Sequence, residues 1–140
     1  MTTQNFFRSL FAMTLIVFTS QFANAQKREI KEGEPIMLEI QNDGDIDKLE
    51  VGNQITFRTT TNVIVEGKEV IRAFSSAVGT VLEKNNSGYN TGSSIKVEVR
   101  HIRAVDGSQV LVTGPINLNN LNIHTPTTVY VKNPLIVEVR

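Results

Sequence analysis

The chain of 140 residues contains no cysteine and no tryptophan. Without cysteine it can form neither a disulfide framework nor a thiolate metal site, and no lipid can be attached through a lipobox cysteine. The fold must therefore depend on a buried apolar core, which a chain of this length can supply without covalent cross-links.

Neither sign of charge is in excess, because 14 lysines and arginines stand against 14 aspartates and glutamates. This balance gives no support to binding of nucleic acid or of an anionic membrane surface. Arg100 and Arg103 flank His101 in a small basic cluster. In a chain without overall positive charge, that cluster fits a solvated strand face better than a nucleic-acid patch.

Aromatic residues are few, and most of them lie near the N-terminus. Five of the seven phenylalanines fall within the first 22 residues. The rest of the chain keeps four aromatic residues, which are Phe57, Phe74, Tyr89 and Tyr130. Sugars and unpaired bases are commonly held by stacking on aromatic side chains, so the sequence disfavours both as ligands.

The N-terminus has the three parts of a secretory signal peptide: Arg8, the apolar run Leu10–Phe18, and the small-residue motif Ala23-Asn24-Ala25. The apolar run is short for a membrane span of about 20 residues. We therefore expect a signal peptide over residues 1–25, cleavage after Ala25, and one domain over residues 26–140 without a membrane span. A disulfide-free exported chain is typical of a bacterial envelope, so the expected location is periplasmic or secreted.

The cleanest pattern in the chain is a strict alternation from Ile55 to Val65, which places Ile55, Phe57, Thr59, Thr61, Val63 and Val65 on one face. After the predicted signal peptide no segment has an apolar helical period. Further short strands are predicted at 36–40, 70–71, 78–82, 95–99, 102–105, 110–112, 116–123, 129–131 and 135–139. The sequence thus predicts an all-β fold, a small antiparallel β-barrel, with a β-sandwich as the alternative.

Several positions predict turns and irregularities. Gly67, within Glu66-Gly67-Lys68, and the pair Asp106-Gly107 predict two hairpin turns. Gly79 indicates a bulge or a close approach of two backbones. Continued alternation after Val99 would bury His101, so we predict a β-bulge near Arg100-His101.

Residues 84–94 are rich in Asn, Gly and Ser and have no periodicity, which predicts a flexible loop. Asn85, Asn86, Tyr89 and Asn90 are its candidate interaction residues. The Asn-rich segment 117–122 could supply an edge strand for pairing with a partner.

Asp43, Asp45 and Asp47 alternate like the first ligands of a calcium loop. Lys48 and Gln54 then stand where such a loop needs Gly and Glu. A solvated acidic turn is the favoured interpretation, and cation binding there is left open.

No arrangement for catalysis stands out. His101 and His124 are far apart in sequence, with no carboxylate pattern beside either. A Gly-x-Ser-x-Gly elbow and a glycine-rich phosphate loop are both absent. We therefore expect no enzyme activity, no catalytic residue, no cofactor and no metal.

Several short motifs together resemble a known type of domain. They are Gly33-x-Pro-Ile-x-Leu, Val51-Gly52-x-x-Ile-x-Phe, Val63-x-Val-x-Gly67-x-x-Val-Ile, Gly79-Thr-Val and Asp106-Gly107-x-x-Val. Their order resembles small bacterial envelope β-domains similar to the C-terminal barrel of TrbI-type scaffolds of conjugation and type IV secretion machines. The resemblance covers about Ile30 to Pro115 and implies a structural barrel in the envelope, with no catalytic residue to carry over.

The chain departs from those scaffolds in two respects. It lacks their inserted helical antenna and their long N-terminal segment linked to the inner membrane. Relatives often have an Ile-Pro-x-Gly corner, where this chain has Ile71-Arg72-Ala73-Phe74. The resemblance therefore implies the fold and the location, and not membership in a secretion channel.

Together these features predict an exported, non-catalytic structural or protein-interaction domain of a bacterial envelope, such as an accessory of an envelope assembly. The expected partner is another envelope protein or a second copy of the chain. The alternative is a small-ligand or glycan-binding module.

Overall fold

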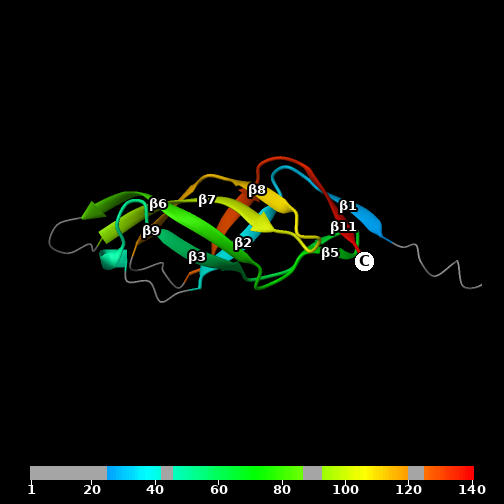
Figure 1. Cartoon of the computed structure of the whole chain (residues 1–140), viewed down its shortest axis with the longest axis horizontal. Helices are drawn as coiled ribbons and strands as arrows, with labels where there is room; N and C mark the ends of the chain where they lie inside the picture. Colours follow the sequence, from blue (N-terminus) through cyan, green and yellow to red (C-terminus); the bar gives the residue numbers. More distant parts are fainter. Residues whose placement is uncertain (1–24, 42–45, 87–92, 120–124) are drawn as a thin grey trace, which may run out of the picture.

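The structure is a computed structural model that describes residues 25–41, 46–86, 93–119 and 125–140 (Figure 1). It is all-β, as predicted, and a single 3-10 turn, η2 (Ile46–Lys48), is the only helical element among these residues. The strands are β1 (Gln26–Ile30), β2 (Pro35–Ile40), β3 (Gln54–Thr59), β4 (Val63–Val65), β5 (Lys68–Ile71), β6 (Ser76–Asn86), β7 (Ser93–Arg103), β8 (Gln109–Thr113), β9 (Pro115–Asn119), β10 (Thr127–Val131) and β11 (Leu135–Val139).

Six strands close into an antiparallel barrel, which confirms the barrel over the sandwich. In ring order they are β2, β3, β6, β7, β8 and β10, and β10 pairs back with β2. Each strand therefore lies beside its neighbour in chain order, as in an up-and-down barrel. β9 follows β8 along the same edge of β7.

Apolar side chains fill the barrel because inward and outward residues alternate along each strand. Leu38, Phe57, Val97 and Val110 are fully buried inside it. Gly79 lies among them, where an added Cβ would overlap the side chain of Val97 and come within 2.8 Å of Phe57 Cε2. The neighbours of Gly79 are thus side chains and not a second backbone, and of the two predicted alternatives the bulge is the one found, as a register shift between Ala77 and Gly79.

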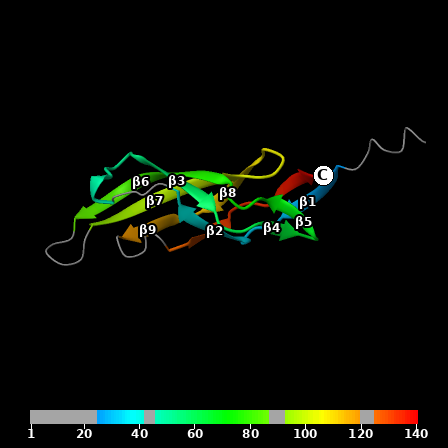
Figure 2. The same cartoon turned by 90° about the horizontal axis from the view of Figure 1, so that it is seen from below.

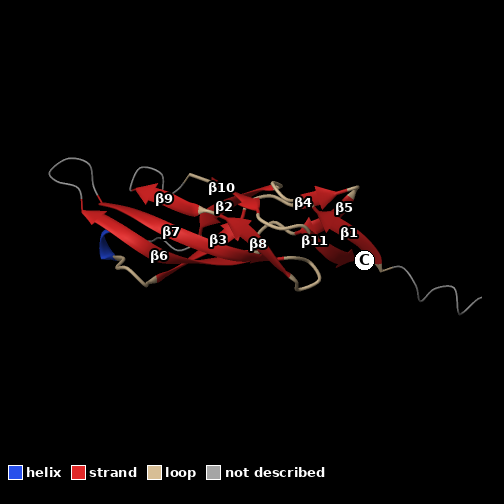
Figure 3. Cartoon of the chain, turned by 90° about the horizontal axis from the view of Figure 1, so that it is seen from above, coloured by secondary structure: helices blue, strands red, loops and turns tan. Residues whose placement is uncertain are grey.

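Two small ribbons cover one end of the barrel, at the right in Figures 1, 2 and 3. One is the β1–β11 pair and the other the β4–β5 hairpin. A two-stranded ribbon is only marginally stable by itself. The two ribbons therefore stabilise each other by burying Val63, Val70 and Val137 between them.

The long strand predicted from Ile55 to Val65 is split in two. β3 ends at Thr59 and β4 begins at Val63, and Thr61, expected to face inward, is exposed. The chain leaves the barrel here because Asn62 Oδ1 accepts a hydrogen bond of 2.6 Å from Ala73 N, which starts the path into the β4–β5 hairpin. Alternation alone cannot distinguish one long strand from two that continue in the same phase.

The bulge predicted near Arg100-His101 is confirmed. Ala77 pairs with Ile102 and Gly79 with Val99, so Val78 faces both Arg100 and His101. Both of these residues are exposed, and Ile102 is fully buried. The extra residue restores the inward phase of β7.

The prediction of a flexible loop over residues 84–94 is wrong at both ends of that segment. β6 extends to Asn86 and β7 begins at Ser93, with Asn85 paired to Ser94 and Asn86 to Ser93. Ladder hydrogen bonds between the strands outweigh the low strand propensity of asparagine. Tyr89 and Asn90 lie outside the described residues.

The turn predicted at Gly67 is a two-residue hairpin turn between the paired residues Val65 and Lys68. Both turn residues have positive φ, 48° for Glu66 and 76° for Gly67. This is the type I′ pattern, in which the twist of the turn matches that of the flanking strands. Lys68, expected in the turn, is the first residue of β5.

Replacing Gly67 with valine should lower the free energy of unfolding by about 1–2 kcal/mol, because a β-branched residue is strained at this φ. Denaturant unfolding measures the change. Glu66→Asn is the matched control at the same turn and should be neutral or stabilising, since Asn-Gly is the preferred type I′ pair. An unchanged midpoint for Gly67→Val would contradict the turn geometry.

Candidate functional site

The most unusual residue of the described surface is Phe74, at the corner between β5 and β6. Its φ is +64°, a left-handed conformation that large side chains rarely adopt, and 67% of the residue is exposed. An exposed aromatic residue in a strained conformation is a candidate for a binding role.

Hydrogen bonds from β3 hold this corner in place. Thr59 Oγ1 donates to Arg72 O at 2.7 Å and accepts from Ser75 N at 2.9 Å. Phe74 N donates to Thr59 O at 2.8 Å. Thr59 is the one buried polar residue of the described core, so its hydroxyl fixes the backbone that presents Phe74.

Further exposed side chains of interface type lie on the outside of the barrel, on the strands that follow Phe74 around the ring. The Arg58 guanidinium lies 5.2 Å from the centre of the Phe74 ring, and Arg58 Nε donates to Glu39 Oε1 at 2.5 Å. Met37 on β2 and Tyr130 on β10 also face outward, one and two strands from Arg58, and are 41% and 50% exposed. We call Met37, Arg58, Phe74 and Tyr130 the aromatic face.

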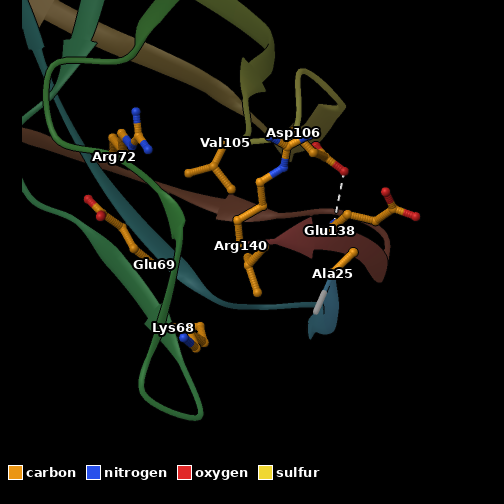
Figure 4. A pocket seen from close by; sticks show the side chains of 9 residues that line it. Ala25, Lys68, Glu69, Arg72, Val105, Asp106, Glu138 and Arg140 are labelled. Atoms are coloured by element: carbon orange, nitrogen blue, oxygen red, sulfur yellow. Dashed lines mark hydrogen bonds between the residues drawn. The ribbon is translucent and has the colours of Figure 1, made fainter. Parts of the chain in front are cut away.

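A second candidate site is a hollow of about 510 Å³ at the ribbon end of the barrel (Figure 4). Most of its lining is charged, with Lys68, Arg72 and Arg140 against Glu69, Asp106 and Glu138. In Figure 4 the Arg72 and Glu69 side chains lie on one side of the hollow and Arg140 on the other. We call this the end hollow.

Asp106, predicted as a turn residue, closes one wall of the end hollow. The β7–β8 hairpin turns here, and Gly107 has φ +86°, so both residues of the predicted turn are confirmed. Asp106 Oδ1 accepts hydrogen bonds from Ser108 N and the Ser108 hydroxyl, and Oδ2 accepts one of 3.0 Å from Glu138 N. The carboxylate thereby ties the turn to β11.

The pKa of Asp106 is lowered from its ordinary value of 3.8. Partial burial acts to raise this pKa, but the hydrogen bonds from the Ser108 hydroxyl and from the backbone of Glu138, Ser108 and Asp106 itself together outweigh it. A carboxyl group with a lowered folded-state pKa stabilises the fold above its unfolded-state pKa. That contribution is lost as the pH falls through the folded-state value.

Asp106→Ala should lower the free energy of unfolding by about 1 kcal/mol at pH 7, since the site is largely exposed. The difference from wild type should shrink below about pH 3.8, where the wild-type carboxyl group also loses its charge. Asp106→Asn keeps an acceptor oxygen, so it should lower the free energy of unfolding by less than Asp106→Ala does. A difference that stays constant from pH 7 to the acid range would contradict the role of the charge.

The acidic turn predicted from Asp43, Asp45 and Asp47 is described only at Asp47, in η2. Lys84 reaches this turn from β6 and donates to Asp47 O at 2.7 Å and to Glu50 Oε1 at 3.3 Å. Its side chain is only 10% exposed. A lysine ammonium group thus lies beside the described part of the turn.

His101 lies on the outer surface of β7, in a hollow whose lining residues include no carboxylate. His124 lies outside the described residues, so its position relative to His101 is not described. Within the described ranges no three His, Cys, Asp or Glu side chains are grouped as metal ligands, and no helix is long and apolar enough to cross a membrane.

Comparison with protein-family models, with curated proteins and with solved structures found no match to this chain. The resemblance to TrbI-type barrels therefore stays a prediction drawn from the sequence motifs.

Proposed function

We propose that this chain is an exported, non-catalytic β-domain of a bacterial envelope that binds another envelope protein through the aromatic face. The observation that carries the proposal is Phe74. A left-handed conformation costs a residue with a side chain about 1–2 kcal/mol, and two thirds of this residue stays in water. Folding alone would favour glycine or asparagine here.

The composition of the aromatic face supports binding to a protein. Tyr, Phe, Met and Arg are enriched at protein interfaces, and Tyr and Arg are enriched at their energetic hot spots as well. After the predicted signal peptide, Phe57, Phe74 and Tyr130 are the aromatic residues within the described ranges, and two of these three lie on this face.

Export is the second part of the proposal, and it rests on the signal-peptide motif. β1 begins at Gln26, so cleavage after Ala25 would leave its pairing with β11 intact. Mass spectrometry of the protein expressed in a bacterium should give a mature chain that starts at Gln26. A cytoplasmic protein that retains residues 1–25 would contradict export.

A photoreactive phenylalanine analogue tests the interaction in the native envelope. Placed at position 74, it should give a discrete covalent adduct with one envelope protein. The matched control is position 51, because Val51 is also exposed, at 62%, and lies in the turn before β3. Recovery of only monomer from position 74, or the same adducts from both positions, would contradict the proposal.

A second candidate function, binding of a small ligand or glycan, is favoured by the end hollow. Its volume of about 510 Å³ is in the range of ligand pockets, and charged groups converge on it. Screening soluble sugars, amino acids and dicarboxylates by amide NMR should then shift Lys68, Arg72 and Val105 together. Shifts confined to other surfaces, or none at millimolar ligand, would exclude this candidate.

A further inference from the structure

A basic surface lies on β7 and the strands beside it. β7 is three strands from β2 in either direction around the six-strand ring, so the outward side chains of β7 point away from Met37. The bulge in β7 turns both Arg100 and His101 outward, and Arg103 follows two residues later. We call this surface the basic face.

Neighbouring strands add to the basic face. His101 pairs with Leu111 on β8, and Lys132 N donates to Leu111 O at 2.8 Å. Lys132, just after β10, therefore lies beside Leu111. The bulge and the strand pairing thus bring basic side chains from two parts of the chain, β7 and the residue after β10, to one surface.

Two shallow hollows open on the basic face, one of about 340 Å³ and one of about 390 Å³. The first is lined by Arg100, Lys132 and Glu98 among others, and the second by His101 and Arg103. Glu98 is the one acidic side chain in either lining. The lining therefore has an excess of positive charge in a chain whose total is balanced.

One acidic group of this surface is paired within it, since Glu98 lies 3.3 Å from Arg100. Asp106 keeps its negative charge but lines the end hollow, where its oxygens accept hydrogen bonds from Ser108 and Glu138 N. Arg103 and Lys132 are exposed, and neither side chain forms an ion pair with another described residue. Both charges remain available to a ligand.

The basic face also has an apolar component. Val78 lines one hollow and Leu111 the other, and each is 44% exposed. An anionic sugar polymer or a nucleic acid would leave these side chains uncovered, and neither hollow has a Phe, Tyr or Trp side chain on which a base could stack. A polypeptide that carries both acidic and apolar side chains complements the charge and the apolar surface together.

We propose that the basic face binds an acidic polypeptide segment in which apolar residues accompany the carboxylates. Arg103 and Lys132 bind its carboxylates, and Val78 and Leu111 contact its apolar side chains. This site is centred on β7 and β8 and meets the aromatic face only at β10, where Lys132 follows Tyr130 by two residues.

Selection from a library of random displayed peptides against the purified domain tests this proposal. The selected sequences should be enriched in Asp and Glu together with Leu, Ile or Val. Their affinity should fall about tenfold or more for the variant Arg103→Glu/Lys132→Glu. The matched control Lys27→Glu/Lys31→Glu makes the same change in charge near β1 and should reduce affinity less than about twofold.

Leu111→Ser gives an independent readout at unchanged charge and should weaken the selected peptides several-fold. Thermal unfolding of each variant checks that the barrel is retained. Three results would overturn the proposal: selected peptides without acidic enrichment, equal losses for the two charge-reversal variants, or tighter binding of heparin or anionic vesicles than of any selected peptide.

Discussion

Replacing Gly79 with alanine is expected to lower the free energy of unfolding by about 3 kcal/mol, the upper end of the range for overpacked cores. The added Cβ would overlap the Val97 side chain and lie 2.8 Å from Phe57 Cε2. Gly79 is held by its pairing to Ile55 and Val99 on both sides, so its backbone cannot move away without breaking the barrel ladder. Chemical denaturation followed by circular dichroism measures the loss.

A double-mutant cycle separates this overlap from other effects of alanine. Val97→Ala alone removes buried methyl groups and should also destabilise the barrel. In the double variant the added Cβ no longer overlaps a Val97 methyl group and only the contact with Phe57 Cε2 remains, so the total loss should be smaller than the sum of the two single losses by about 1 kcal/mol or more. Simple additivity would show that Gly79 and Val97 do not meet inside the barrel.

Replacing Thr59 with valine is expected to destabilise the protein by about 2 kcal/mol, although the two side chains have almost the same shape. The hydroxyl makes two hydrogen bonds to the backbone of the corner, at Arg72 and Ser75. Valine has no oxygen to accept the part-buried hydrogen bond that Ser75 N donates to the Thr59 hydroxyl. The corner that presents Phe74 should loosen, which faster hydrogen exchange at Phe74 and Ser75 would report.

Serine at the same position is the control for Thr59. It keeps the hydroxyl and loses one buried methyl group, so the expected loss is about 1 kcal/mol and hydrogen exchange at the corner should stay slow. If valine and serine behave alike, packing of the methyl group rather than the hydroxyl holds the corner.

The sequence was sufficient for the fold class because alternation of apolar residues is a local signal. Ile55, Phe57 and Thr59 face inward as their spacing predicts, and the hairpins at Gly67 and Asp106 follow from turn chemistry. Even the bulge at Arg100-His101 was predictable, since without it His101 would face the core.

Features set by tertiary pairing were not predictable. The split between β3 and β4 depends on a hydrogen bond from Ala73 to Asn62, eleven residues earlier in the chain. Asn85 and Asn86 are strand residues because Ser93 and Ser94 pair with them. In both places a contact outweighs the local preference of the residues.

The candidate sites were the least predictable part. One sequence signal pointed to Phe74: it stands where the resembled domains often have the glycine of an Ile-Pro-x-Gly corner. Its exposure and its positive φ are known only from the structure. Lys132 is 29 positions from Arg103, and only the strand register brings both to the basic face. Asn85 and Asn86, predicted as loop residues for an interaction, lie instead at the paired ends of β6 and β7.

The variant Phe74→Asn tests the central claim, that Phe74 serves binding rather than folding. Asparagine tolerates the left-handed conformation, so the melting temperature should stay within about 3 °C of wild type or rise. Affinity for the envelope protein captured at position 74 should fall about 30-fold or more, as for an interface hot spot. A lower melting temperature with unchanged affinity would contradict the claim, because Phe74 would then be a residue that stabilises the barrel.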